Sequence, residues 1–366
     1  MLQNRWDSGK VLIVLGPRQV GKTTLLEQMC KEHGEFAFFN GDEPDTQIRL
    51  SNVSEAQLRR LLAGHHTVFI DEAQRIENIG ITLKIIHDRI KDIRLVVSGS
   101  SALELANNIN EPLTGRKWEY ILFPISWQEL VQNQTYARAI PQLETRLIYG
   151  MYPEVVTMKG EEDAVLRQIA GSYLYKDLLG YKGIRKPDML SKLLTALAFQ
   201  VGSEVSYNEL SNTLRIDRAT IENYIDLLEK AFVVFRLQPF SRNLRSEISS
   251  SRKVYFYDNG MRNAILNNFS PLALRNDVGA LWENFLVSER MKANHYRQAH
   301  VKAYFWRTHA QQEIDYIEEY DGQLHAYEFK WKTGTKVKFP KTFTDSYPRT
   351  ETLVITPDNF DDFLQY

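Results

Sequence analysis

The chain has almost no cysteine, since Cys30 is the only one among 366 residues. An intrachain disulfide is therefore excluded, and a reducing compartment such as the cytoplasm is expected. No apolar run is long enough to span a bilayer, and the first strand-like run begins close to Met1, without the pattern of a signal peptide. The formal net charge is only −1. The whole molecule has no general attraction to nucleic acid, so DNA binding would need a local basic patch.

The length and composition predict a globular protein with more than one domain. At 366 residues the chain exceeds what one ordinary hydrophobic core organises, so two or three domains are expected. Its 43% hydrophobic and 25% charged residues are typical of soluble globular proteins.

Residues 16–23 match the phosphate-binding loop pattern G-x-x-x-x-G-K-S/T at every fixed position. An apolar run at 11–15 predicts a buried parallel strand before the loop, and a helix is expected after it. Such a turn directs backbone N–H groups at an anion. We expect Lys22 to reach the β- and γ-phosphates of a nucleoside triphosphate, and Thr23 to hold Mg²⁺. The predicted nucleotide-binding residues of the loop are Gly16, Pro17, Arg18, Gln19, Val20, Gly21, Lys22, Thr23 and Thr24.

A second motif, Thr67 to Gln74, is a β-branched and aromatic strand that ends in two acids. A carboxylate at the carboxyl edge of a parallel strand lies where α/β proteins bind their ligands. We expect Asp71 to orient Mg²⁺ or its waters, and Glu72 to act as the general base on the attacking water. The alternative is a strand that ends in solvated acids. The Asp-Glu pair indicates hydrolysis of the nucleotide in addition to binding.

Small hydroxyl residues follow a third strand-like run. Ser98 and Ser100 are expected beside the γ-phosphate, where a polar side chain senses the nucleotide state, and a simple turn is the alternative. The predicted strands are 11–15, 35–40, the run that ends at Asp71, 94–98 and 118–123. They predict an α/β fold, a five-stranded, mostly parallel P-loop NTPase sheet with helices on both faces.

Arg116 lies just before the last of these strands. An arginine there would reach a phosphate in cis, or act in trans as a finger on a neighbouring subunit of a homo-oligomer. A surface ion pair is an equally weighted alternative. Arg18, inside the loop, has the same ambiguity.

The middle of the chain is largely helical up to about Phe240. Ser126 followed by Glu129 is a capping-box signature for a helix. Farther on come a short helix at 207–214, a turn at 215–217, a helix at 218–230, and strand-like runs at 232–237 and 253–257. This order predicts a winged helix-turn-helix followed along the chain by a further domain.

The charges of this predicted winged helix give opposite indications about DNA. The exposed face of its second helix carries Glu222, Asp226 and Glu229, which disfavours insertion into a major groove. Basic residues around the wing could still contact a backbone, although such charges are usually a solvated face. They are Arg236, Arg242, Arg245, Arg252 and Lys253.

The sequence of the C-terminal part predicts a helix that carries Glu283, followed by three strands. Asp321-Gly322 joins the last two strands and indicates a hairpin. A two-residue loop there sets Asp315 opposite Glu328. Two facing acids repel each other, and a cation between them would relieve this. With Lys330, these acids have the composition of a metal-dependent phosphodiesterase site. The alternative is the polar outer face of an ordinary hairpin.

The order of these motifs resembles a family of bacterial AAA-type P-loop ATPases with a C-terminal region of unknown function, similar to a winged helix followed by a PD-(D/E)XK nuclease-like domain. The resemblance rests on Gly16–Thr24, Asp71–Gln74, Gly99–Ser101, Leu113–Arg116, Gly150–Glu154, Tyr255–Gly260, Glu313–Asp315 and Glu328–Lys330. It implies ATP and Mg²⁺ as cofactors. Ile314 stands where the proline that names the nuclease pattern is expected.

Together these features predict four segments: an AAA-type ATPase core at 1–125, a helical lid or linker at 126–190, a winged helix at 191–260 and a nuclease-like domain at 261–366. The predicted function is an ATPase whose cycle controls the attached domains. The alternatives are an ATP-regulated, metal-dependent DNA nuclease and a non-catalytic C-terminal domain that docks a protein partner. Lys336, Lys338 and Lys341 favour a phosphate-bearing partner.

Overall fold

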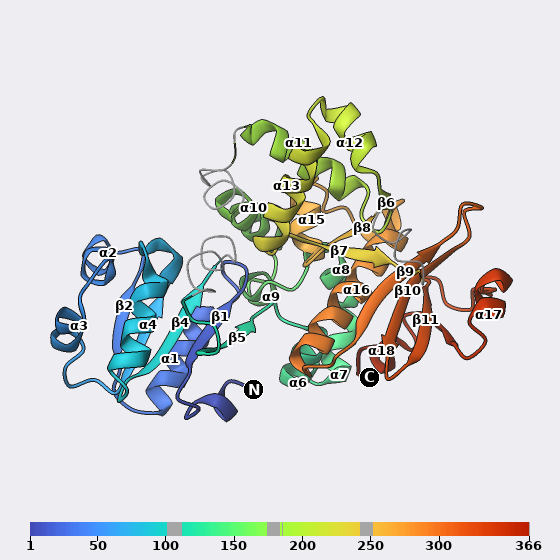
Figure 1. The fold of residues 1–366 in the computed structure, drawn as a ribbon. Coiled ribbons are helices and arrows are strands. Elements are labelled where there is room, and N and C mark those ends of the chain that lie inside the picture. Colours follow the sequence, from blue (N-terminus) through green and yellow to red (C-terminus); the bar gives the residue numbers. More distant parts are fainter. Residues whose placement is uncertain (101–111, 174–183, 185, 242–251, 366) are drawn as a thin grey trace. The chain divides into compact units, whose positions relative to one another are not determined.

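The computed structural model describes residues 1–100, 112–173, 184, 186–241 and 252–365 (Figure 1). These residues form two compact units. Unit 1 contains Met1–Phe123 with Lys230–Phe232, and unit 2 contains Pro124–Glu229 with Val233–Tyr366. Two of the basic wing residues, Arg242 and Arg245, lie outside the described residues, as does Ser101.

Unit 1 is built on a five-stranded sheet whose neighbouring strands all pair in parallel, in the order β2-β3-β4-β1-β5. The strands are β1 (Val11–Leu15), β2 (Ala37–Asn40), β3 (Thr67–Asp71), β4 (Arg94–Gly99) and β5 (Lys117–Ile121). The predicted α/β fold with a parallel five-stranded sheet is confirmed. Because all strands run the same way, their carboxyl ends meet at one edge of the sheet.

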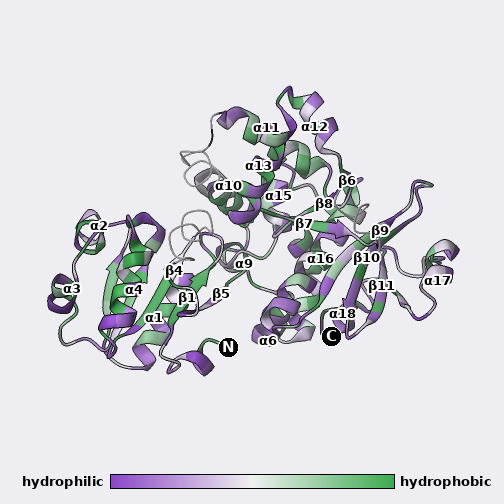
Figure 2. Ribbon diagram, in the orientation of Figure 1, coloured by the Kyte–Doolittle hydropathy of each residue, from purple (hydrophilic) through white to green (hydrophobic). Residues whose placement is uncertain are grey.

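Strand β1 is hydrophobic along its whole length, as Figure 2 shows, and β4 is apolar from Leu95 to Val97 between polar ends. Every residue of β1 and β3 is buried. Such strands read as continuous apolar runs because helices cover the sheet. On one face, Leu12 and Val14 of β1 share a core with Leu26 and Met29 of α1 (Lys22–Glu32). The other helices of unit 1 are α2 (Pro44–Leu50), α3 (Glu55–Leu61) and α4 (Ile79–Arg89).

Unit 2 contains a seven-stranded sheet in the order β12-β11-β10-β9-β7-β8-β6. Its strands are β6 (Glu204–Val205), β7 (Val234–Pro239), β8 (Arg252–Phe256), β9 (Lys302–Arg307), β10 (Glu313–Tyr320), β11 (Gln323–Phe329) and β12 (Glu351–Ile355). The expected hairpin forms β10 and β11, and Tyr320 pairs with Gln323. Asp321 and Gly322 have φ values of 51° and 77°, as a two-residue type I′ turn requires.

Most helices of unit 2 precede β7 in the sequence. They are α6 (Trp127–Gln134), α7 (Tyr136–Ala139), α8 (Leu143–Tyr149), α9 (Pro153–Thr157), α10 (Glu162–Tyr173), α11 (Pro187–Phe199), α12 (Tyr207–Leu214), α13 (Arg218–Lys230), α15 (Asn259–Ile265), α16 (Val278–Tyr296), α17 (Lys341–Ser346) and α18 (Phe360–Gln365). The capping box of α6 is present, because Ser126 and Glu129 each bond the other's backbone N–H.

Helices α12 and α13 lie where the predicted helix-turn-helix was expected, and β7 pairs with β8 in an antiparallel hairpin. The predicted stripe of α13 is buried; its members are Ile221, Tyr224, Ile225 and Leu228. Strand β7 also pairs in parallel with β9, so one sheet runs through the boundary that we expected near residue 260. The division into four segments stays a prediction.

The acids on α13 are not a bare negative face. Arg236 of β7 pairs with Asp226, at 2.7 Å, and with Glu229, while Arg218 lies 3.4 Å from Glu222. Basic side chains partly neutralise these acids. Their presence therefore argues less strongly against a nucleic-acid partner than the sequence alone suggested.

The segment that we expected to be a lid packs into the core of unit 2. The ring of Trp127, on α6, lies against Phe285 of α16 and Phe360 of α18. Its backbone N–H donates to the buried Glu289 of α16 at 2.6 Å, and its indole N–H donates to Asp361 at 2.7 Å. Helix α6 is therefore part of the same hydrophobic core as the C-terminal strands.

The motifs around Gly150 and Asp258 are distant in the sequence but pack together in unit 2. Asp258 accepts hydrogen bonds from the backbone N–H groups of Met151, at 2.6 Å, and Met261, at 3.0 Å. Gly150 has a φ of 71°, and a Cβ there would lie 2.1 Å from Asp258 Oδ1. A Cβ at Gly260 would lie 2.1 Å from the carbonyl oxygen of Tyr149. The close approach explains why glycine stands at both positions.

We expect Gly150→Ala to destabilise unit 2 by roughly 2–5 kcal/mol, from left-handed backbone strain and overpacking against Asp258. Gly160→Ala is the matched control, since Gly160 also has a positive φ, 89°, but nothing lies within 4 Å of the added Cβ. It should lose only about 1–2 kcal/mol. Denaturant unfolding of both variants measures the difference, and equal losses would contradict the packing argument.

Candidate functional site

The phosphate loop lies between β1 and α1, at the carboxyl edge of the sheet of unit 1. Gly21 has a φ of 91°, and Gly16 has a φ of 149°. A Cβ at Gly16 would lie 2.0 Å from the carbonyl oxygen of Leu122, so only glycine fits there. Lys22 is buried, and its ammonium donates to the carbonyl oxygens of Gly16, at 3.0 Å, and Pro17, at 2.6 Å. These bonds hold the lysine inside the loop.

Asp71 lies at the end of β3, with a hydroxyl on each oxygen of its carboxylate. Thr23, on α1, donates to Oδ2 at 2.9 Å, and Ser98, on β4, donates to Oδ1. The structure thus brings together the two residues predicted to hold Mg²⁺ and one predicted sensor. Ser98 is fully buried, and its hydroxyl also accepts from the backbone N–H of Glu72 at 3.3 Å.

Glu72 follows with a φ of 48°, an uncommon conformation for a residue other than glycine. A short 3₁₀ turn, Ala73–Arg75, begins at this point. The side-chain amide of Gln74 donates both to the Glu72 carboxylate and, at 2.8 Å, to the hydroxyl of Ser100. The sequence indicated no role for Gln74, although this residue lies in the same motif as Asp71 and Glu72.

The side chain of Arg116 forms an ion pair within unit 1. Its Nε lies 2.9 Å from Oδ1 of Asp88, at the end of α4. The Arg116 guanidinium and, to a lesser degree, His87 lower the pKa of Asp88 to about 2. This contact is the ion pair that we kept as the alternative to a phosphate contact. Arg18, the other arginine considered, is part of the loop between Pro17 and Gln19.

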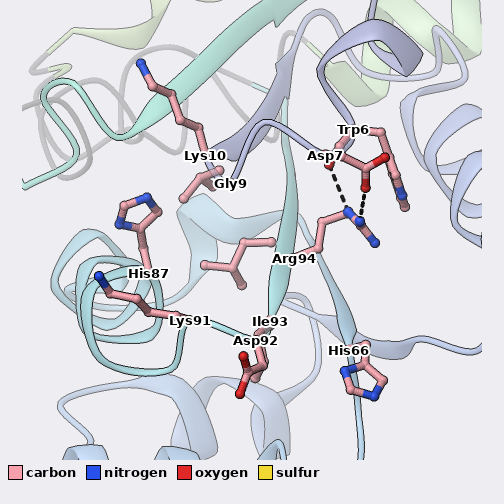
Figure 3. Close-up of a pocket in the computed structure, with 12 residues that line it drawn as sticks. Trp6, Asp7, Gly9, Lys10, His66, His87, Lys91, Asp92, Ile93 and Arg94 are labelled. Carbon is pink, nitrogen blue, oxygen red and sulfur yellow. Dashed lines mark hydrogen bonds and ion pairs between the residues drawn. The ribbon is translucent and has the colours of Figure 1, made fainter.

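A separate pocket of about 500 Å³ opens at the amino ends of β1, β3 and β4, the edge of the sheet opposite the phosphate loop (Figure 3). Lys10, His66, His87 and Lys91 line it, and Arg94 pairs with Asp7. Arg94 is further held by the carbonyl oxygen of Trp6, at 2.8 Å. The pocket shares no residue with the predicted nucleotide site.

The predicted acids of the C-terminal part also gather in unit 2. Asp315 Oδ2 accepts from the backbone N–H of Phe329, at 2.8 Å. The ammonium of Lys330 lies 2.8 Å from Glu328 Oε2 and 3.4 Å from Asp315 Oδ2. Lys330 thus occupies the position between the two acids where we expected a cation.

Lys253 is a residue whose role the sequence analysis missed. We described it as part of a basic wing surface, which is wrong, because its side chain is fully buried. Its ammonium lies 2.9 Å from Glu283 Oε1 and 2.6 Å from Glu313 Oε1. The hydroxyl of Tyr255 donates to the same oxygen of Glu283 at 2.7 Å. No local sequence signal indicated that a strand of the hairpin, β8, would pack against α16.

Two of these acids have raised pKa values. Burial raises the pKa of Glu283 to about 7, although Lys253 opposes the shift, and Asp315 adds a like charge. Burial and the charge of Asp315 likewise raise the pKa of Glu328 to about 7. The charge of Asp315 therefore acts on both of the other predicted acids. Within the described part of the chain, no group of three or more His, Cys, Asp or Glu side chains has the geometry to hold a metal ion.

Comparison with protein families identifies the class of unit 1. Residues 8–131 match an AAA domain. A Walker-type ATPase of Pyrococcus abyssi has a similar fold, with a TM-score of 0.52 and 14% identity, over 72% of this chain and 93% of that chain. With the loop geometry, these findings define unit 1 as a P-loop ATPase domain of the AAA type. Residues 140–272 and 278–365 match two domains of unknown function, DUF8612 and DUF4143.

Relatives extend over most of the chain. Uncharacterized proteins of Mycobacterium tuberculosis and Mycobacterium bovis are each 30% identical over 331 residues, which is 89% of this chain and 71% of theirs. An uncharacterized protein of Haemophilus influenzae is 24% identical over 278 residues, 70% of this chain and 69% of its own. The chain belongs to the family of these mycobacterial proteins. Among its described helices, none has the length and apolar character needed to cross a membrane.

The raised pKa values predict a pH dependence of stability. An acid with a folded pKa near 7 and an ordinary value of 4.5 favours the folded state when protonated. This contribution is complete below about pH 4.5 and is lost as the pH rises through 7. We therefore expect the free energy of unfolding of unit 2 to fall over this window.

Asp315→Asn removes the like charge and should flatten this fall, by about 1.4 kcal/mol for each pKa unit removed. Urea unfolding at pH 5, 6, 7 and 8 measures both proteins. Parallel curves for Asp315→Asn and the unmodified chain would show that Asp315 does not act on these acids.

Proposed function

We propose that unit 1 binds ATP with Mg²⁺ and hydrolyses it, and that this cycle controls the domains in unit 2. The observation that supports the proposal most directly is the contact of Thr23 and Ser98 with the two oxygens of Asp71, beside the loop that holds Lys22. A hydroxyl and a carboxylate at this spacing are the donors that Mg²⁺ prefers. Bound Mg²⁺ would neutralise charge on the phosphates.

In this proposal each residue has one task. Lys22 exchanges the carbonyl oxygens of Gly16 and Pro17 for the β- and γ-phosphates, and Thr23 and Asp71 hold the metal ion. Glu72 removes a proton from the attacking water. Arg116 would have to leave Asp88 to contact a phosphate, in cis or in a neighbouring subunit of a homo-oligomer, so a structural role fits its present contact better.

The first test separates binding from hydrolysis. Lys22→Ala should remove most ATP affinity, because the phosphates lose their charged partner. Glu72→Gln should bind ATP nearly normally and hydrolyse it roughly a hundred- to ten-thousand-fold more slowly, because the base is gone. Equilibrium binding of ATP and steady-state phosphate release measure the two effects. A Glu72→Gln protein with an unchanged turnover number would contradict the role of Glu72.

Unit 2 would respond to this cycle as one piece. We propose that residues 191–260 form a winged helix and that residues 261–366, which include α16, form a nuclease-like domain. Their shared sheet, through β7 and β9, and the buried pair of Lys253 with Glu283 support a rigid connection between them. Breaking such a buried pair by removing one partner typically costs about 3–5 kcal/mol. The proposed partner of this unit is DNA, contacted through its backbone, or a protein.

A metal-dependent DNA nuclease is the second candidate function. It is favoured by the convergence of Glu283, Asp315 and Glu328, each of which has only one oxygen in a described hydrogen bond or ion pair. As the three acids stand, they lack the geometry of a metal site, so a divalent cation would bind only after their side chains rotate. The cation would then supply charge stabilisation at a phosphodiester. Lys330 already neutralises two of these acids, so the cation would compete with its ammonium.

Thermal unfolding with Mn²⁺ or Mg²⁺ tests the nuclease candidate. If the acids hold a cation, the midpoint of unit 2 should rise with metal concentration, because a ligand of the folded state stabilises it by mass action. Asp315→Asn should abolish most of the rise. An equal rise in Asp315→Asn, or none in the unmodified chain, would contradict the candidate and favour a non-catalytic domain that docks a partner.

A further inference from the structure

Gln74 connects the predicted general base to the end of β4. The residue is only 8% exposed, and its Nε2 donates to Glu72 Oε2 and, at 2.8 Å, to Ser100 Oγ. An amide nitrogen has two hydrogens, and both are used here. The side chain is therefore held at two points.

These bonds determine which way the amide faces. A carboxylate only accepts hydrogen bonds, so Glu72 must face the nitrogen of Gln74. The oxygen, Oε1, consequently faces another direction. It is buried, and no donor lies within hydrogen-bonding distance of it in the part of the chain that the structure describes. A buried acceptor without a donor is uncommon and costs about 1–3 kcal/mol.

The turn that presents these groups is tightly constrained. The left-handed backbone of Glu72 begins the 3₁₀ turn that contains Gln74. A Cβ at Gly41, which follows β2, would lie 2.3 Å from the carbonyl oxygen of Glu72, and the N–H of Gly41 donates to the carbonyl oxygen of Asp71 at 2.8 Å. On the other side, the N–H of Glu72 donates to Ser98 of β4. The strained conformation is thus held from both neighbouring strands, as is common at functional sites.

We propose that Gln74 is a catalytic residue that orients the attacking water. The water donates one hydrogen to Glu72 and the other to Gln74 Oε1, which directs a lone pair of its oxygen at the γ-phosphorus. This inference rests on the proposed ATP hydrolysis. The water oxygen bonds to the γ-phosphorus, the bond from that phosphorus to the β–γ bridging oxygen breaks, and ADP leaves with the electron pair. Glu72 receives the proton of the water.

Ser100 positions Gln74 for this task. Its hydroxyl oxygen accepts from Gln74, and it keeps its own hydrogen to donate to another acceptor. A γ-phosphate at the end of β4 is such an acceptor. Ser100 is therefore a positioning residue, and it makes the orientation of Gln74 depend on the nucleotide that is bound.

The test compares variants of the full chain. Gln74→Ala should lower kcat roughly ten- to a hundred-fold, less than loss of the base, and change the Kd for ATP less than about threefold. Ser100→Ala should lower kcat by a smaller factor. Gln28→Ala is the matched control, because Gln28 also bonds a glutamate, Glu32, but on the exposed surface of α1. It should leave both constants unchanged.

The split between kcat and the Kd for ATP separates catalysis from a structural role. Gln74→Glu has nearly the same shape but lacks the N–H groups that bond Glu72 and Ser100, so its kcat should fall with little change in Kd. Equal losses of kcat and of ATP affinity, or unchanged kcat for Gln74→Ala, overturn the inference. If Glu72→Gln is slow in the same assay, the proposed ATPase function still holds, and if it is not, that function fails first.

Discussion

The proposed nucleotide site depends on one carboxylate, that of Asp71. Its oxygens accept from Thr23, in the first turn of α1, and from Ser98, near the end of β4. These residues come from three distant parts of the sequence, and the strand order β3-β4-β1 brings them together. A buried carboxylate costs free energy unless hydrogen bonds satisfy it. The same bonds that satisfy Asp71 therefore place the loop against the two neighbouring strands.

In unit 2, buried charged groups are likewise satisfied by ion pairs and hydrogen bonds, and there are more of them. Arg290 and Glu318 form a pair with both side chains at most 3% exposed, and Lys253 lies between Glu283 and Glu313. Removing one partner from such a pair leaves an uncompensated charge, which is why these groups restrict how the helices and the sheet can pack. Asp258 acts similarly, because its carboxylate joins the end of α8 to the start of α15.

Much of the local structure was predictable, because its causes are local. The capping box at Ser126, the Asp321-Gly322 turn and the buried stripe of α13 depend on residues within a few positions of one another. The loop at 16–23 was predictable since its backbone must point N–H groups at an anion. The parallel sheet followed from strand-like runs separated by helices.

What the sequence alone determined is the phosphate loop, the acid pair at Asp71 and Glu72 and the parallel sheet, because each is a pattern of neighbouring residues with a short-range physical cause. The tertiary structure alone decided the partners of buried charges. It gave Lys253 to Glu283 and Glu313, Arg116 to Asp88, and Gln74 to both Glu72 and Ser100. Such partners lie on different helices and strands, and no periodicity in the sequence shows which buried side chains will contact one another.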